Sequence, residues 1–135
     1  MWTSYDTLTG KILATMTDRK SAGKNAVIAG SWSASKYYIK ANRAWPYPPK
    51  PGAGTWQWDL ATETWQFDAE KTARELRASR DRALESVDRV NPMWWASLSP
   101  ERQTQLQAYR QALLDLPQQP GWPMQVIWPE RPRWL

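Results

Sequence analysis

The chain has 135 residues and a formal net charge of +5, and it contains neither cysteine nor histidine. Disulfides, thiolate metal sites and histidine-dependent acid–base catalysis are therefore excluded, so we expect neither an enzyme nor a bound cofactor or metal. No apolar run reaches the length of a membrane span and the first residues lack a secretory pattern, which predicts a cytoplasmic protein without membrane insertion.

The first 68 residues predict an antiparallel β module. Short runs rich in β-forming residues cover Lys11–Thr17, Ala26–Ala29 and Lys36–Lys40, and turn residues separate them. Four prolines within Trp45–Pro51 predict an extended, polyproline-like crossing, because proline cannot donate to a central sheet.

A tryptophan-rich hairpin closes this module, with strands predicted at Thr55–Asp59 and Thr64–Phe67. The two-residue period of a strand places Trp56 and Trp58 on one face, and Trp65 can meet them from the second strand. Facing aromatic pairs contribute about 0.2–1 kcal/mol each. Because an isolated two-stranded ribbon is marginal, this hairpin needs other strands or a partner.

The β module is basic: residues 11–50 hold eight lysines and arginines against one acid. Interleaved aromatic residues make a nucleic-acid surface conceivable. Lysine outnumbers arginine, however, and no nucleic-acid motif is present, so a solvated basic face is favoured and nucleic acid is not the expected partner.

Two helices are predicted for residues 69–116, within a second region that spans residues 69–135. The first helix starts behind the capping residue Asp68 and ends at Asn91–Pro92. Met93–Trp95 then forms a bulky apolar link, and Ser99–Pro100 starts the second helix. The link is short, so the helices should pair antiparallel.

Each helix carries an apolar stripe at intervals of three or four residues, and Arg80 interrupts the first. The first stripe consists of Ala73, Leu76, Ala83, Leu84, Val87 and Val90, and the second of Leu106, Tyr109, Leu113 and Leu116. The overall prediction is therefore an α+β fold.

The last segment, residues 117–135, is predicted as an extended arm. Pro117, Pro120 and Pro123 end the helix, because each lacks a backbone donor and has a fixed φ. The arm carries apolar side chains that include Trp122 and Trp128. It must lie either on this chain's own core or on a partner.

In combination, these motifs resemble the phage tail assembly chaperone family. They run over residues 77–132 as RASRDRALESVD, a tryptophan-containing link, YRQALLDLP, GWP and WP. The sequence departs from the family pattern at Arg89, where a tryptophan often follows the aspartate, and at Leu114, where arginine is common. Such a resemblance implies a non-catalytic protein that helps a tail fibre, or another tail protein, to fold, trimerise or attach.

The resemblance also suggests roles for individual residues. Tyr109, Leu113 and Leu116 would pair the helices, and Arg110 and Asp115 would orient the arm. Trp122 and Trp128 would be its anchors, either folding back or meeting the partner. The candidate partner-binding residues are Tyr109, Arg110, Leu113, Asp115, Trp122, Trp128, Pro129, Trp56, Trp58 and Trp65.

The expected partner is a tail fibre, which would be a trimer, or another tail structural protein. The sequence also leaves open that this chain associates with itself. Assembly would take place in the host cytoplasm. As an alternative, the protein is a structural component retained in the virion tail that touches host glycan through its tryptophan-rich face.

Overall fold

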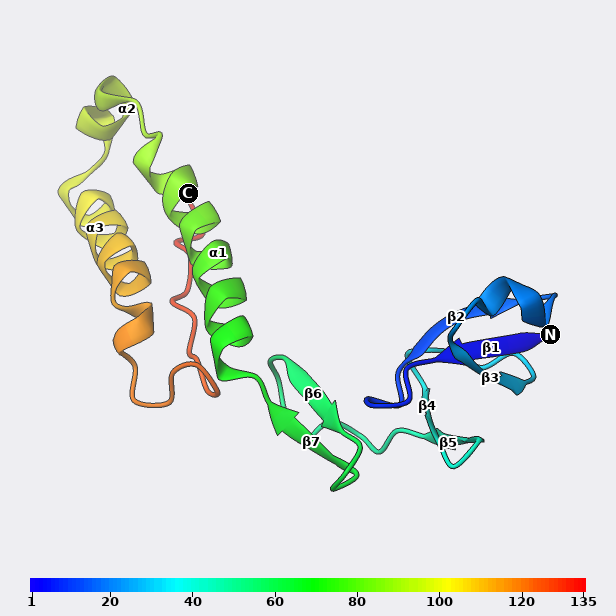
Figure 1. Cartoon of the computed structure of the whole chain (residues 1–135). Coiled ribbons are helices and arrows are strands. Elements are labelled where there is room, and N and C mark those ends of the chain that lie inside the picture. The colour runs from blue at the N-terminus through cyan, green and yellow to red at the C-terminus, as the bar shows by residue number, and fades with distance from the viewer. The chain divides into compact units, whose positions relative to one another are not determined.

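The computed structural model describes residues 1–135, which form two compact units (Figure 1). The β unit contains residues 1–52 and 56–66, and the C-terminal unit contains residues 53–55 and 67–135. Helices make up 36% of the chain and strands 21%, which confirms the α+β class. No helix has both the length and the apolar character that crossing a membrane requires.

A three-stranded antiparallel sheet in the order β2-β1-β3 begins the β unit. Its strands are β1 (Trp2–Tyr5), β2 (Ile12–Met16) and β3 (Ala26–Ala29). A 3-10 helix, η1 (Arg19–Ala22), connects β2 to β3. The strands predicted at Lys11–Thr17 and Ala26–Ala29 are confirmed as β2 and β3, whereas the central strand β1 was not predicted.

The next two strands, β4 (Tyr37–Lys40) and β5 (Arg43–Pro46), form a tight hairpin. Ala41 and Asn42 make its turn, both with positive φ, the geometry that matches the twist of the paired strands. The expectation of a polyproline-like segment from residue 45 is wrong at its start. Trp45 pairs with Tyr38, and Pro46 ends the strand, where its missing donor costs least.

The core of the β unit is small. Tyr5, Ile28 and Ile39 are buried at its centre, and half-buried apolar residues surround them. Gly10, in the turn between β1 and β2, connects to strand β4, since its carbonyl oxygen accepts a hydrogen bond from the Ile39 N–H at 2.9 Å. Gly10 has φ +70°, and a Cβ there would lie 2.8 Å from the Ile39 carbonyl oxygen, so only glycine fits.

The tryptophan-rich hairpin forms as predicted, with β6 (Trp56–Asp59) and β7 (Thr64–Phe67) as a two-stranded sheet. The Asp59 carboxylate accepts a bond from the Ala61 amide at 3.0 Å and thereby supports the turn. Glu63 completes this turn with φ 52°.

The C-terminal unit is a helical hairpin of α1 (Ala69–Asp88) and α3 (Pro100–Leu114), joined through a short helix α2 (Pro92–Ser97). Asp68 and Ser99 cap the two long helices as predicted, each accepting a backbone N–H three residues on. The apolar link predicted at Met93–Trp95 lies within the short helix α2, which was not predicted.

Local sequence accounts for α2. Asn91 caps it by accepting the Met93 N–H at 2.8 Å, and Pro92 occupies the first turn, where a missing donor is harmless.

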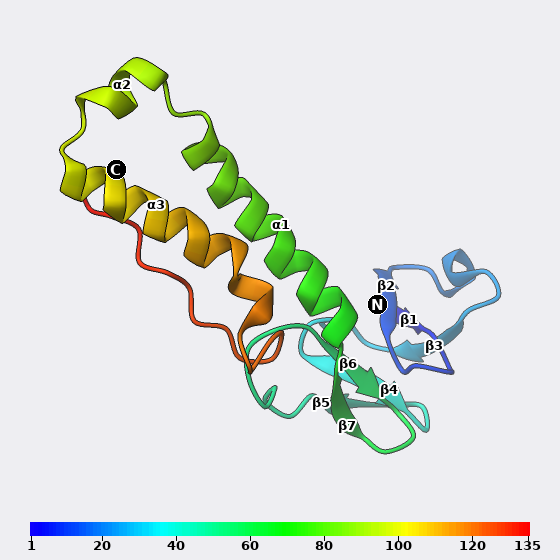
Figure 2. The ribbon, with the colours of Figure 1, turned by 90° about the vertical axis from the view of Figure 1, so that its left-hand side faces the viewer.

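The core of the C-terminal unit lies between α1 and α3, which run side by side in Figures 1 and 2. Its most buried residues are Val87, Leu106, Leu113 and Leu116, which expose between 0% and 5% of their surface. Leu116 belongs to a short 3-10 helix, η2 (Leu116–Gln118), that ends the hairpin.

Candidate functional site

The C-terminal arm, residues 119–135, folds back along its own helices (Figure 2). Its end is fixed by Trp134, whose indole N–H donates to the Gln105 side chain at 2.6 Å. The Trp134 ring also lies 6.2 Å from the Trp94 ring, and the Arg102 guanidinium lies 5.3 Å from its centroid. The arm therefore has defined contacts with α2 and α3.

A side-chain clamp shapes the first half of the arm. The Gln119 amide donates to the Ile127 carbonyl oxygen at 2.7 Å and accepts from the Ile127 N–H at 2.8 Å. Within this loop, the Gln125 N–H donates to the Gly121 carbonyl oxygen at 2.8 Å. A Cβ at residue 121 would lie 2.8 Å from the Gln125 carbonyl oxygen, so the turn depends on glycine.

We call residues 119–128 the clamped loop, and its side chains fall into two sets. Trp122 is half-buried, and the Arg77 guanidinium of α1 lies 5.7 Å from its ring centroid, within cation–π range. In contrast, Ile127 exposes 81% of its surface, Met124 52% and Trp128 41%. A short, closed loop thus holds three large apolar side chains in solvent.

Tyr109 and Pro129 are brought together beside the clamped loop. Both line a groove of about 550 Å³ between α3 and the last residues of the arm. Both residues are half-buried. Leu113, by contrast, exposes 1% of its surface and supports the pairing of the helices from inside.

Arg110 and Asp115 do not orient the arm as expected. Arg110 donates to the Asp88 carboxylate at 2.8 Å and so ties α3 to α1, and this contact raises the pKa of the guanidinium. Asp115 accepts from the Gln111 amide at 3.1 Å, one turn earlier on the same helix. The residues that hold the arm are instead Gln119 and Gln105.

Sequence reasoning missed Gln119 because glutamine carries no charge or motif that marks such a contact. The only local signal is the glycine two residues later, which permits the chain to return within eight residues.

In the β unit, the tryptophans of the hairpin join two tyrosines. We call Tyr38, Tyr47, Trp58 and Trp65 the aromatic cluster, and their contacting rings have centroids 4.7–5.2 Å apart. Trp58 is buried at its centre, and its indole nitrogen has no hydrogen-bond partner. The cluster therefore fills a second core of this unit.

The outer rings of the hairpin are also engaged. Trp65 donates its indole N–H to the Pro48 carbonyl oxygen at 2.8 Å, and Lys50 lies 5.3 Å from its ring centroid. Trp56 is half-buried and donates to the Gly52 carbonyl oxygen at 3.0 Å. Two of the three hairpin indole groups thus fix the proline-rich crossing to the hairpin.

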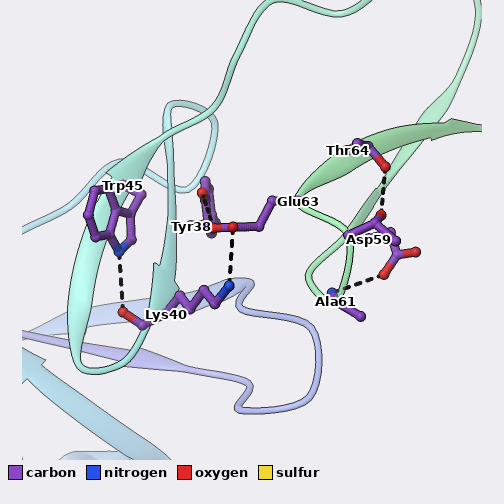
Figure 3. Close-up of polar contacts among 8 residues, drawn as sticks. Tyr38, Lys40, Trp45, Asp59, Ala61, Glu63 and Thr64 are labelled. Carbon is purple, nitrogen blue, oxygen red and sulfur yellow. Dashed lines mark hydrogen bonds and ion pairs between the residues drawn. The ribbon is translucent and has the colours of Figure 1, made fainter.

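The carboxylate of Glu63 also borders the aromatic cluster (Figure 3). Glu63 accepts from the Tyr38 hydroxyl at 2.9 Å and pairs with the Lys40 ammonium at 3.2 Å. These two contacts, the tyrosine hydrogen bond first, lower the pKa of Glu63. Burial, followed by the contact with the carboxylate, raises the pKa of Tyr38.

This arrangement offers apolar surfaces for binding. No group of three or more acidic side chains lies close enough together to hold a metal ion. The most exposed large apolar residues of the C-terminal unit are Met93, at 83%, and Ile127. These surfaces are suited to protein–protein contact.

Comparison with known proteins identifies the C-terminal unit. A family model described as phage tail assembly chaperone protein matches residues 73–133, which include most of α1, all of α2 and α3, and nearly the whole arm. No curated protein and no solved structure matches the chain. Over these residues, the C-terminal unit is therefore similar to the phage tail assembly chaperone family.

Proposed function

We propose that this protein is a non-catalytic chaperone that binds a phage tail structural protein through its C-terminal arm while the tail is assembled. The first candidate partner is a tail fibre, whose folding, trimerisation or attachment it would assist. The family match supports the chaperone role and the class of partner. We place this activity in the host cytoplasm, where the tail proteins are made.

The observation that carries the proposal is the exposure of apolar side chains on a loop that is itself held in place. Ile127, Met124 and Trp128 stay exposed to solvent, at 81%, 52% and 41% of their surface. Unassembled fibre subunits expose apolar edges and trimer surfaces of their own. Covering one apolar surface with another removes both from water and requires no catalytic group.

Retention in the virion with binding to glycan is less well supported. Sugar rings stack on free aromatic faces, but the rings of the aromatic cluster lie against one another. Trp45, which is 38% exposed, has the Arg43 guanidinium 4.5 Å from its ring centroid. Detection of the protein in purified particles would revive this alternative.

Co-expression tests the proposal directly. The tagged chain is produced together with the fibre protein of the same phage, and the complex is captured and sized by light scattering. We expect a stable complex whose mass gives the stoichiometry and reveals any self-association. Failure to capture any tail structural protein would contradict the proposed function.

A further inference from the structure

We propose that the clamped loop is a preformed plug that enters an apolar pocket rimmed by carboxylates on the tail protein. This inference rests on the proposed function and adds the binding element, its positioning residue and the chemistry of the surface that receives it.

The first step concerns the direction of Ile127. Its backbone N–H and carbonyl oxygen are both bonded to Gln119, at 2.8 and 2.7 Å, as they would be to a neighbouring strand. With both backbone groups fixed toward Gln119, the side chain is held in one direction, and it exposes 81% of its surface. The clamp therefore sets where the most exposed large apolar side chain of the arm points.

The second step concerns the rest of the loop, which is anchored from behind. Trp122 lies under the Arg77 guanidinium of α1, and Val126 is half-buried. Gly121 closes the turn in a geometry that a Cβ would prevent. Because these contacts order the loop before binding, little conformational entropy remains to be lost when a partner arrives.

The third step concerns the shape of the partner. The apolar side chains of Met124, Ile127 and Trp128 lie within five consecutive residues of one closed loop. Compact, projecting groups of this kind bury most area in a concave site, as the central anchors of protein interfaces do. A pocket is therefore a better receptor than a flat sheet.

The fourth step concerns charge. The clamped loop has no charged side chain, and the segment that follows it carries Arg131 and Arg133 against one acid, Glu130. All three are exposed. A pocket with carboxylates at its rim would complement this surface, guide the encounter and fix the orientation of the loop.

A second copy of this chain is a less suitable receptor. It offers an apolar groove of about 380 Å³ lined by Val87, Val90, Trp95 and Leu106. The carboxylate at that groove, Asp88, is already paired with Arg110 at 2.8 Å, so much of its charge is compensated and it attracts a further arginine less strongly. We therefore assign the loop to the tail protein, and binding to a second copy is one of the outcomes of the test below.

The test replaces one donor of the clamp. In Gln119→Glu the carboxylate can still accept the Ile127 N–H, but it cannot donate to the Ile127 carbonyl oxygen and repels it. Gln118→Glu is the matched control, since Gln118 is exposed, lies next in the chain and takes no part in the clamp. Both full-length variants are titrated against the purified tail protein, and their melting temperatures are compared.

We expect Gln119→Glu to bind about tenfold more weakly than Gln118→Glu while both melt at the same temperature. Equal affinities of the two variants would overturn the plug, although binding of the unaltered chain would leave the proposed function standing. Absence of binding by the unaltered chain would overturn both. Self-association that Gln119→Glu abolishes would replace the tail protein by a second copy as the receptor.

The charge at the rim is tested separately with Arg131→Gln/Arg133→Gln. This variant should bind several-fold more weakly at low salt, and the difference should shrink at high salt because screening removes it. Affinity unchanged at low salt would overturn the carboxylate rim.

Discussion

The two units of this chain are both rich in tryptophan, yet the aromatic cluster of the β unit and the clamped loop of the C-terminal unit differ in exposure. In the β unit, Trp58 and Trp65 lie against Tyr38 and Tyr47, and Trp58 exposes only 8% of its surface. In the C-terminal unit, the clamped loop holds Ile127 and its neighbours in solvent. The comparison teaches that the number of tryptophans in a region does not predict how much of its apolar surface is exposed to solvent.

The contrast recurs within the arm itself. Trp122 and Trp134 contact arginines of α1 and α3, at 5.7 and 5.3 Å from ring centroid to guanidinium, and fix the arm to the helices. Trp128 lies between them in sequence and remains 41% exposed. Within one short segment, Trp122 and Trp134 therefore anchor the arm to the helices, whereas Trp128 is exposed to solvent.

The largest effect that the comparison predicts is on the stability of the β unit. Trp58→Ala should lower the free energy of unfolding by about 3–5 kcal/mol, because it removes the centre of the aromatic cluster. Urea denaturation of the full-length chain measures this change. Trp45→Ala, at a residue 38% exposed, is the control and should cost clearly less. Equal losses would mean that the cluster is not a core.

The next effect is on binding. Ile127→Asp should weaken capture of the tail protein about 100-fold, because a carboxylate would have to be desolvated in an apolar contact. The melting temperature should stay within about 1–2 °C of the unaltered chain, as Ile127 is 81% exposed. Gln125→Asp places the same charge in the same loop and should retain most binding. A large fall in melting temperature for Ile127→Asp would assign the residue to the fold instead.

A smaller pair of effects separates the two kinds of tryptophan in the arm. Trp122→Ala should lower stability by about 1–2 kcal/mol, since it removes a half-buried ring and its contact with Arg77. Trp128→Ala should leave stability nearly unchanged and weaken binding about tenfold. Melting curves measure the loss of stability of each variant, and titrations with the tail protein measure its affinity. If both variants lost the same stability and the same affinity, Trp122 and Trp128 would not have different roles.

The smallest effect is a pH dependence confined to the β unit. The pKa of Glu63 is lower in the folded chain, so its charged form stabilises the fold above the usual carboxyl range. This contribution is lost as the pH falls through the lowered pKa. Tyr38 has the opposite pH dependence, because its pKa is raised in the folded chain. Its protonated form stabilises the fold below pH 10, and this contribution is lost as the pH rises through the raised pKa.

Measuring the free energy of unfolding at pH 7 and at pH 3 tests the contribution of Glu63. Glu63→Gln should lose less stability between these two values than the unaltered chain does, because the titrating group is gone. Glu130→Gln, in the arm, serves as the control and should keep the full dependence. The prediction fails if Glu63→Gln and the unaltered chain lose the same stability.

Local sequence predicted the two long helices and the β6–β7 hairpin, but not β1, β5 or α2. Asp68 and Ser99 mark helix starts through contacts within three residues, so they can be read from sequence alone. Strand β1 buries Thr3 and Ser4, whose hydroxyls bond to the carbonyl oxygens of Gly30 and Ala14. A strand with buried polar side chains lacks the apolar alternation from which strands are predicted.

The candidate site was predictable only in outline. The prolines and tryptophans indicated an extended apolar arm, but which of its side chains turn inward depends on contacts between distant residues. Gln119 meets Ile127 eight positions later, and Trp134 meets Gln105 twenty-nine positions earlier. Such contacts follow from the folded path of the chain, which spacing and composition do not encode.

Hydroxyl-radical footprinting of the complex with the tail protein tests the central claim most directly. Methionine and tryptophan side chains report on each surface: Met124 and Trp128 in the clamped loop, and Trp45 in the β unit, which are 52%, 41% and 38% exposed. We expect binding to protect Met124 and Trp128 from oxidation and to leave Trp45 unchanged. Protection of Trp45 with Met124 and Trp128 as reactive as in the free chain would contradict the account.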